Sequence, residues 1–228
     1  MKTIICSLWF LGAVFLANAQ QPLHYWTFEG KDILIDQAAN KTLNIKNYAA
    51  KVKIVKGVAG NGIEPVSSGK LIVAGLLKPV QGLSDFTLEL AFNGGQFMFS
   101  TFPKPDFRLN FSSGGIAIRY SVMRKGRQVN ENWNIPLKGA GVTSYHNLAN
   151  GQWHHFVLVA RRSGNFEIWI DGKTDVQFTQ KISSFDSWVI TGNDGLRLNA
   201  AIDELAFYNT ALSPELIQQH AQELQNGE

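Results

Sequence analysis

Two adjacent histidines, His154 and His155, are the first residues whose type suggests chemistry, because imidazole nitrogens bind zinc and transfer protons. They lie in an apolar segment with the character of a strand, and neighbouring strand residues point to opposite faces of a sheet. The two rings therefore cannot bind one zinc ion together. We expect each ring to pack and hydrogen-bond on its own face.

Asp203 and Glu204 form a second pair of interest, since paired carboxylates serve as acid and base in glycoside hydrolysis. Alternation along a strand separates these two side chains as well. A catalytic strand of the Glu-x-Asp-x-Glu type places three carboxylates on one face, and the sequence contains no such pattern. Serine-hydrolase and phosphate-loop motifs are also absent from the sequence. We therefore expect no catalytic activity.

A ligand-binding surface is the third kind of site that the residue types suggest. Arg108 and Asn110 are two residues apart, as are Asn130 and Asn132, so each pair shares one face of its strand. Guanidinium and amide groups bind sugar hydroxyls, and an aromatic ring stacks under the sugar. We predict a ligand-binding groove lined by polar strand residues and one aromatic residue: Arg108, Asn110, Arg119, Asn130, Asn132 and Trp169. A solvated sheet face is the alternative, and the unknown strand order leaves both open.

Short strands must position these residues. Alternating apolar and polar residues predict strands over 85–92, 107–111, 116–120 and 165–170. Residues 155–160 are apolar on both sides, which is typical of a central strand covered on both faces. Asp171 and Gly172 predict a type I′ hairpin, and the basic residues 124–127 predict a solvated hairpin tip. Many short strands without intervening helices predict an all-β sandwich or barrel.

One helix is predicted, after the last strand. Ser213 is a good N-cap, Pro214 suits the first helical position, and Glu215 lies in the first turn, where the helix dipole favours an acid. The residues that follow form one apolar stripe at helical spacing: Leu216, Ile217, His220, Ala221 and Leu224. We expect this helix to pack across an edge or the back of the sandwich.

Residues 1–19 have the character of a signal peptide. Lys2 gives a positive start, an apolar stretch follows over 4–16, and Ala17-Asn18-Ala19 is a small-x-small cleavage site. The apolar stretch is short for a membrane span. We predict cleavage after Ala19, export to the periplasm or the medium, and a single domain over 20–228.

Composition limits the partners and the organism. The sequence has 21 Lys plus Arg and 18 Asp plus Glu, and a net charge of +3 predicts no nucleic-acid partner. Hydrophobic residues make up 45%, enough for a sizeable core. The one cysteine, Cys6, lies in the signal segment, so the exported chain forms no disulfide. An exported chain without disulfides is typical of bacteria.

Three stretches resemble the laminin-G-like, concanavalin A-type jelly-roll family of bacterial exported proteins. They are His24–Glu29 (HYWTFE), the "WHH" segment at 151–157 with the hairpin at 167–172, and Ala201–Leu216 with its "IDE" motif. The stretches follow the family's order from residue 24 to residue 216, so the resemblance covers essentially the whole exported chain. It implies an antiparallel two-sheet jelly-roll sandwich with a short C-terminal helix.

The resemblance also implies a structural Ca²⁺ ion. Asp203 in the last strand and Glu29 near the first strand are the carboxylates that it assigns to this ion. Calcium takes six to eight oxygens, and backbone oxygens of the Gly57–Gly60 loop would supply the rest.

By analogy with the family, we expect an exported, non-catalytic module that binds a carbohydrate or glycoconjugate. Fold-level analogy leaves two alternatives open. The first is a protein–protein adhesion module that binds another surface protein, because laminin-G-like domains also bind proteins. The second is a polysaccharide hydrolase or lyase with an unfamiliar site.

Overall fold

The computed structural model describes the chain in segments. They are residues 20–31, 33, 35–38, 41–42, 52–66, 80–83, 85–101, 107–112, 115–136, 148, 150–179, 187–190 and 194–226. The predicted signal peptide lies outside the described residues. Within the described residues, no helix is long and apolar enough to cross a membrane.

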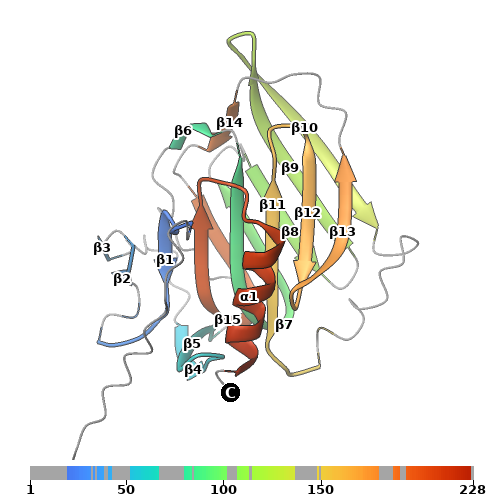
Figure 1. Ribbon diagram of the computed structural model, residues 1–228. Helices are drawn as coiled ribbons and strands as arrows, with labels where there is room; N and C mark the ends of the chain where they lie inside the picture. Colours follow the sequence, from blue (N-terminus) through green and yellow to red (C-terminus); the bar gives the residue numbers. More distant parts are fainter. Residues whose placement is uncertain are drawn as a thin grey trace, which may run out of the picture.

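The described residues form strands followed by one helix (Figure 1). The first strands are β1 (His24–Trp26), β2 (Ile35–Asp36), β3 (Lys41–Thr42), β4 (Val52–Lys56), β5 (Asn61–Pro65), β6 (Val80–Leu83), β7 (Phe86–Thr101) and β8 (Phe107–Ser112). The later elements are β9 (Gly115–Arg124), β10 (Arg127–Pro136), β11 (His154–Ala160), β12 (Asn165–Ile170), β13 (Lys173–Thr179), β14 (Ser187–Ile190), β15 (Asp194–Tyr208) and α1 (Pro214–Asn226). The prediction of a mostly antiparallel β fold with one short C-terminal helix is confirmed.

The two long strands β7 and β15 organise the fold. They pair antiparallel over 87–101 of β7, and β15 also pairs with β1 and β5. The other edge of β7 pairs with β11 over residues 86–92 and with β8 over residues 97–100. Because β7 changes partners midway, the ladders join thirteen of the described strands into one sheet. Its main path is β13-β12-β11-β7-β8-β9-β14-β6, and β1, β4, β5, β10 and β15 branch from that path. The strands β2 and β3 form a separate two-stranded sheet.

The central strands are buried on both faces, as the sequence predicts for residues 155–160. On one face, Phe156 and Leu158 of β11 pair with Leu90 and Leu88 of β7, and these side chains lie in the core. On the other face, Val157 and Val159 lie in an apolar cluster under α1. We call this second group the α1 cluster; its members are Val157, Val159, Trp169, Ala206, Tyr208, Leu212 and Ile217.

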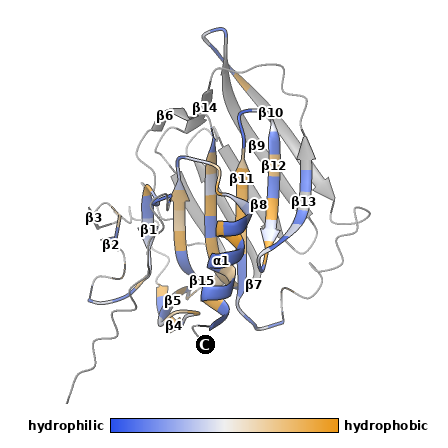
Figure 2. Cartoon of the chain, viewed as in Figure 1, coloured by the Kyte–Doolittle hydropathy of each residue, from blue (hydrophilic) through white to orange (hydrophobic). Residues whose placement is uncertain are grey.

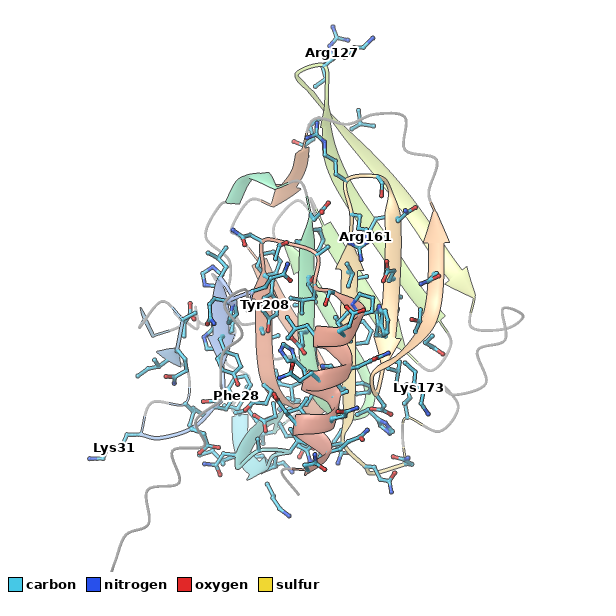
Figure 3. The ribbon with its side chains drawn as sticks, in the orientation of Figure 1. Phe28, Lys31, Arg127, Arg161, Lys173 and Tyr208 are labelled. Carbon is cyan, nitrogen blue, oxygen red and sulfur yellow. The ribbon has the colours of Figure 1, made fainter. Side chains whose placement is uncertain are left out.

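Both predicted hairpins form. Asp171 and Gly172 have φ angles of 50° and 73°, the two positive values that a type I′ turn requires. Lys125 and Gly126, between β9 and β10, have φ angles of 48° and 71° and are exposed. Arg127 extends from this tip, away from the rest of the molecule (Figure 3). Residues 125–127 of the basic segment thus form an exposed hairpin tip, as the sequence predicts.

The helix α1 begins and packs as predicted. The backbone N–H of Leu216 donates to Ser213 Oγ at 3.3 Å, which makes Ser213 the N-cap. Ile217 and Ala221 are the buried helical residues, and α1 lies over β15, β7 and β11 (Figure 1). Figure 2 shows the mixed hydropathy expected of a helix with one apolar side. The helix therefore covers the sheet face opposite the main core.

Candidate functional site

Strand order brings the predicted polar residues onto neighbouring strands. The register pairs Arg108 of β8 with Arg119 of β9, and Arg119 with Asn132 of β10. Residues directly opposite one another in antiparallel strands share a face of the sheet. Arg108, Arg119 and Asn132 therefore form one row across three adjacent strands, which we call the polar row.

The remaining predicted amides flank the polar row. Asn110 pairs with Ala117, two residues before Arg119, and Asn130 pairs with Ser121, two residues after Arg119. Both positions share the face of the polar row because the period of a strand is two residues. The strand order, which the sequence does not give, thus places all five polar positions on one face of the sheet. The role of these residues in binding stays a prediction.

Trp169 does not belong to this surface. It lies on β12, which β11 and β7 separate from β8 in the strand order. Its side chain is in the α1 cluster, the residue is 5% exposed, and its indole N–H donates to Glu167 Oε2 at 3.1 Å. Because α1 covers it, Trp169 offers no open ring face to a sugar, and we remove it from the predicted groove.

Asp203 holds a glycine-rich loop through hydrogen bonds. The residue is fully buried, and its Oδ2 accepts the backbone N–H groups of Val58 at 3.0 Å and Ala59 at 3.2 Å. Its Oδ1 accepts the N–H of Glu204 at 2.8 Å. A Cβ at Gly57 would overlap Asp203 Oδ2, so glycine is what lets the carboxylate approach the loop. Burial raises the pKa of Asp203 to about 7, although the three N–H groups favour its ionised form.

Glu29 holds the other end of the same loop. Its Oε1 accepts the backbone N–H of Asn61, and its Oε2 accepts Asn61 Nδ2 at 3.0 Å. Gly60 has a φ of 103° and lies against the Glu29 carboxylate. The two acids that the resemblance assigns to calcium therefore converge on one loop, residues 57–61. We call this arrangement the loop clasp.

The donor groups of the loop clasp do not fit a calcium ion. Calcium requires oxygen ligands, whereas the loop directs N–H hydrogens at both carboxylates. Among the residues that the structure describes, no group of three or more His, Cys, Asp or Glu side chains is arranged to hold a metal. The loop would have to turn its carbonyls toward Asp203 before a cation could bind there.

Chelation tests this point. We expect a chelator to leave the melting temperature of the wild-type protein unchanged, because direct hydrogen bonds hold the loop. Asp203→Ala leaves buried N–H groups without an acceptor and is expected to lower the free energy of unfolding by about 2–4 kcal/mol. Thermal melts with EDTA or added calcium measure both. A calcium-dependent rise in melting temperature that Asp203→Ala abolishes would establish the predicted ion and contradict our reading of the clasp.

The two histidines separate as predicted and have different partners. His154 faces the core side, where its ring lies 5.9 Å from Phe92 and its Nδ1 is 2.9 Å from Asp171 Oδ2. His155 faces α1, and its Nε2 is 2.6 Å from Glu89 Oε1. The prediction that the pair packs and hydrogen-bonds on opposite faces is confirmed.

Glu89 is the centre of a buried charge cluster that sequence reasoning missed. Glu89 lies on β7 and is 5% exposed. Besides its contact with His155, its Oε1 lies 2.9 Å from Nδ1 of His220 on α1. Hydrogen bonds from His155 and His220 lower the pKa of Glu89 to about 2 and outweigh its burial. The same contact raises the pKa of His220, against the effect of burial. The cluster ties α1 to the sheet.

The signal for this cluster was weak. Alternation over 85–92 placed Glu89 with the polar residues of its strand, which are normally solvated. His220 was one member of an apolar helical stripe. The two residues come together only because α1 covers this face of the sheet. The alternation of apolar and polar residues contains no information about which helix lies over which strand.

A cavity of about 230 Å³ lies between α1 and the β1–β15 pair. The Tyr25 hydroxyl donates to Glu204 Oε2 in its lining. Burial raises the pKa of Tyr25 and of Glu204, so Tyr25 stays a neutral donor. Glu204 reaches this position from a φ of 49° at an irregularity in the β15–β7 register. The bulge turns Glu204 toward Tyr25 while Asp203 points to the loop clasp.

The described strands form a mostly antiparallel β fold, and the polar row lies on three of its adjacent strands. Residues 83–218, more than half of the chain, match the laminin-G type family of the concanavalin A-like lectin/glucanases superfamily. The protein belongs to this superfamily, as the sequence resemblance indicates. No curated protein sequence matches the chain.

Solved structures share the fold at low sequence identity. Domain 4 of AbnA, an extracellular GH43 arabinanase of Geobacillus stearothermophilus solved with arabinotriose, has a TM-score of 0.56 and 18% identity over 89% of this chain and 99% of that domain. The binding domain of botulinum neurotoxin serotype G has a TM-score of 0.61 and 11% identity, covering 89% of this chain and 51% of that one. The binding domain of Paraclostridial Mosquitocidal Protein 1 has a TM-score of 0.58 and 14% identity, covering 89% and 52%. The chain thus spans about half the length of these toxin domains.

Proposed function

We propose that the protein is an exported, non-catalytic module that binds carbohydrate through the polar row on β8, β9 and β10. The observation that carries this proposal is the register that aligns Arg108, Arg119 and Asn132. Neighbouring strands lie about 4.8 Å apart, so the row extends about 10 Å across the sheet. That length suits several hydroxyls of a short oligosaccharide.

The chemistry of the row supports a sugar ligand. A guanidinium presents several N–H donors in one plane, and an amide presents both a donor and an acceptor. Together they can satisfy adjacent hydroxyls, which both donate and accept. The fold is shared with an arabinanase domain solved with arabinotriose, which makes this trisaccharide a suitable first probe.

Export rests on the sequence of residues 1–19. Cleavage after Ala19 would leave Gln20 as the first residue, and N-terminal sequencing of secreted protein tests this by finding Gln20 or its pyroglutamate form. Intact Met1 on exported protein would contradict it.

Arg119→Ala tests the polar row, because Arg119 pairs with both other members of the row. We expect the substitution to weaken glycan binding by more than about tenfold, or 1.4 kcal/mol, with little change in melting temperature. A glycan array followed by calorimetry, with arabinotriose among the probes, measures the affinity. Arg127→Ala is the control, since Arg127 is an exposed arginine at the tip of the same β9–β10 hairpin. Equal binding by wild type and Arg119→Ala would refute the site.

A protein receptor is the second candidate ligand, and the shared fold with toxin binding domains favours it. Protein pull-down with no response on the glycan array would support this adhesion function. The third candidate, a hydrolase or lyase, predicts release of new reducing ends from polysaccharide, which a reducing-sugar assay detects.

A further inference from the structure

The strand register continues the face of the polar row onto two more strands. Arg108 of β8 pairs with Ser100 of β7, and Ser100 pairs with Gly195 of β15. Residues directly opposite one another share a face, so this face crosses five adjacent strands: β10, β9, β8, β7 and β15. Arg197 of β15 stands on the same face, because it is two residues from Gly195 in an unbroken stretch of the register.

The two faces of these five strand segments differ in composition. On the face opposite the polar row, the register aligns one apolar residue from each strand: Leu196, Phe99, Leu109, Ile118 and Trp133. On the face of the polar row, the neighbouring positions align as Gly195, Ser100, Arg108, Arg119 and Asn132. An apolar face opposite a polar face is typical of an antiparallel sheet that packs on the core with one side only. The pattern therefore leaves the polar-row face for a ligand.

The polar-row face is basic in composition. It consists of alternate residues within 96–100, 108–112, 115–123, 128–136 and 195–199. These positions include three arginines, Arg108, Arg119 and Arg197, and no Asp or Glu. Glu131 is the only acid in those segments, and it pairs with Tyr120 on the opposite face. The remaining positions are mostly Asn, Gln and Ser, so the composition of the face favours an anion that also carries hydroxyl groups.

Two of the arginines stand directly opposite each other. Arg108 and Arg119 are register partners on β8 and β9. Like charges in directly opposed positions destabilise a sheet, because they repel each other across the short distance between strands. Binding sites are where a sequence keeps residues that local stability disfavours. An anion bound at this pair would replace the repulsion with two attractions, and arginine suits carboxylate, sulfate or phosphate oxygens because its N–H donors lie in one plane.

We propose that the polar-row face binds an anionic oligosaccharide, with one carboxylate or sulfate group at Arg108 and Arg119 and a second acidic group at Arg197. The proposal rests on the carbohydrate-binding function proposed above and names the class of sugar. Arg197 is two strands and two residues away from Arg108, which corresponds to about 12 Å between their backbones. Substituents of one sugar ring lie closer together than this. The two acidic groups therefore belong to different residues of the oligosaccharide.

Isothermal titration calorimetry with acidic and neutral oligosaccharides tests the class of sugar. The acidic probes are trigalacturonate, which carries carboxylates, and a κ-carrageenan tetrasaccharide, which carries sulfates. The neutral probes are arabinotriose and galactotriose. We expect at least one acidic probe to bind more than about tenfold more tightly than either neutral probe. Raising NaCl from about 0.05 M to about 0.5 M is expected to weaken that binding by more than about fivefold, because salt screens the charges.

Arg197→Gln and Arg108→Gln test the two parts of the site. Arg197→Gln is expected to weaken binding of the acidic probe by more than about fivefold and to leave neutral probes unaffected. Arg127→Gln is the control, because it removes the same charge from the exposed hairpin tip, and we expect a change below about twofold. Arg108→Gln is expected to weaken acidic binding by more than about tenfold without lowering the melting temperature, since it removes one of two opposed like charges. Unchanged acidic binding in Arg108→Gln would overturn the proposal.

The outcomes separate this proposal from the carbohydrate-binding function on which it rests. Neutral sugars that bind as tightly as acidic ones, with binding lost in Arg119→Ala, would keep the polar row as a sugar site and refute its preference for an anion. Absence of binding by every sugar on the glycan array would refute the carbohydrate-binding function itself. Acidic binding that Arg197→Gln and Arg127→Gln weaken equally would indicate a general attraction between charges and overturn the proposed site.

Discussion

Glu89→Ala is expected to lower the free energy of unfolding by about 3–5 kcal/mol, because it removes the central member of a buried charge cluster. His155 and His220 both bind Glu89, and the substitution leaves both imidazoles beneath α1 without their carboxylate. A natural domain is stable by only about 5–15 kcal/mol, so the loss is a large part of the total.

Denaturant titration of wild type and Glu89→Ala measures this difference. Glu64→Ala is the control, since Glu64 pairs with Lys53 at 2.9 Å where both side chains are substantially exposed. A surface ion pair of this kind contributes about 0–1 kcal/mol. A Glu89→Ala protein as stable as Glu64→Ala would show that the cluster does not hold α1 to the sheet.

Acid is expected to remove the same stabilisation. The pKa of Glu89 is lowered from 4.5 to about 2 in the folded protein, which corresponds to about 3 kcal/mol. A lowered carboxylate pKa contributes stability that is present above the unfolded value and is lost as the pH falls toward the folded value. The contribution of Glu89 should therefore be complete above about pH 5 and vanish near pH 2.

Comparison with Glu89→Gln isolates this effect. Burial raises the pKa of Asp203 to about 7 and also raises that of Glu204, so these acids act in the opposite direction and are stabilised by protonation. Asp203 is present in both proteins and cancels in the difference, whereas Glu204 cancels only in part, because the charge of Glu89 contributes to its raised pKa. We expect the stability gap between wild type and Glu89→Gln to narrow by about 3 kcal/mol between pH 5 and pH 2. A constant gap would contradict the lowered pKa.

The alkaline side of the profile belongs to His220. Its pKa is raised by Glu89, so its contribution is present below about 6.5 and is lost as the pH rises through the folded value. The cluster should therefore stabilise the fold most between about pH 5 and pH 6.5.

Local patterns predicted most of the fold. Alternation identified β7, β8, β9 and β12, and the Asp171–Gly172 pair identified the hairpin, because each depends on residues close in sequence. The partner change of β7 was not predictable in this way. It depends on which distant strands pair with the two halves of β7, and a local apolar pattern does not identify a partner strand.

Side-chain roles were predicted less completely than strands. The resemblance assigns Asp203 and Glu29 to a calcium ion beside the Gly57–Gly60 loop, and both carboxylates contact that loop. The direction of the loop's N–H groups depends on backbone torsions that the sequence does not show. Trp169 alternates like a residue on an open face, and only the position of α1 shows that it is covered. In both cases a contact between distant segments decides the chemistry.

The pairing of β1 with β15 makes folding depend on nearly the whole length of the domain. His24 at one end pairs with Phe207 at the other, and β15 is also the long partner of β7. Such distant pairings require large loops to close, and the chain loses entropy in closing them before stabilising contacts form. Pairings of this kind slow folding. A chain exported as we propose would pass a translocation pore while its central ladder still lacks residues 194–208. In an exported chain, this topology would delay completion of the β7–β15 ladder until residues 194–208 have crossed.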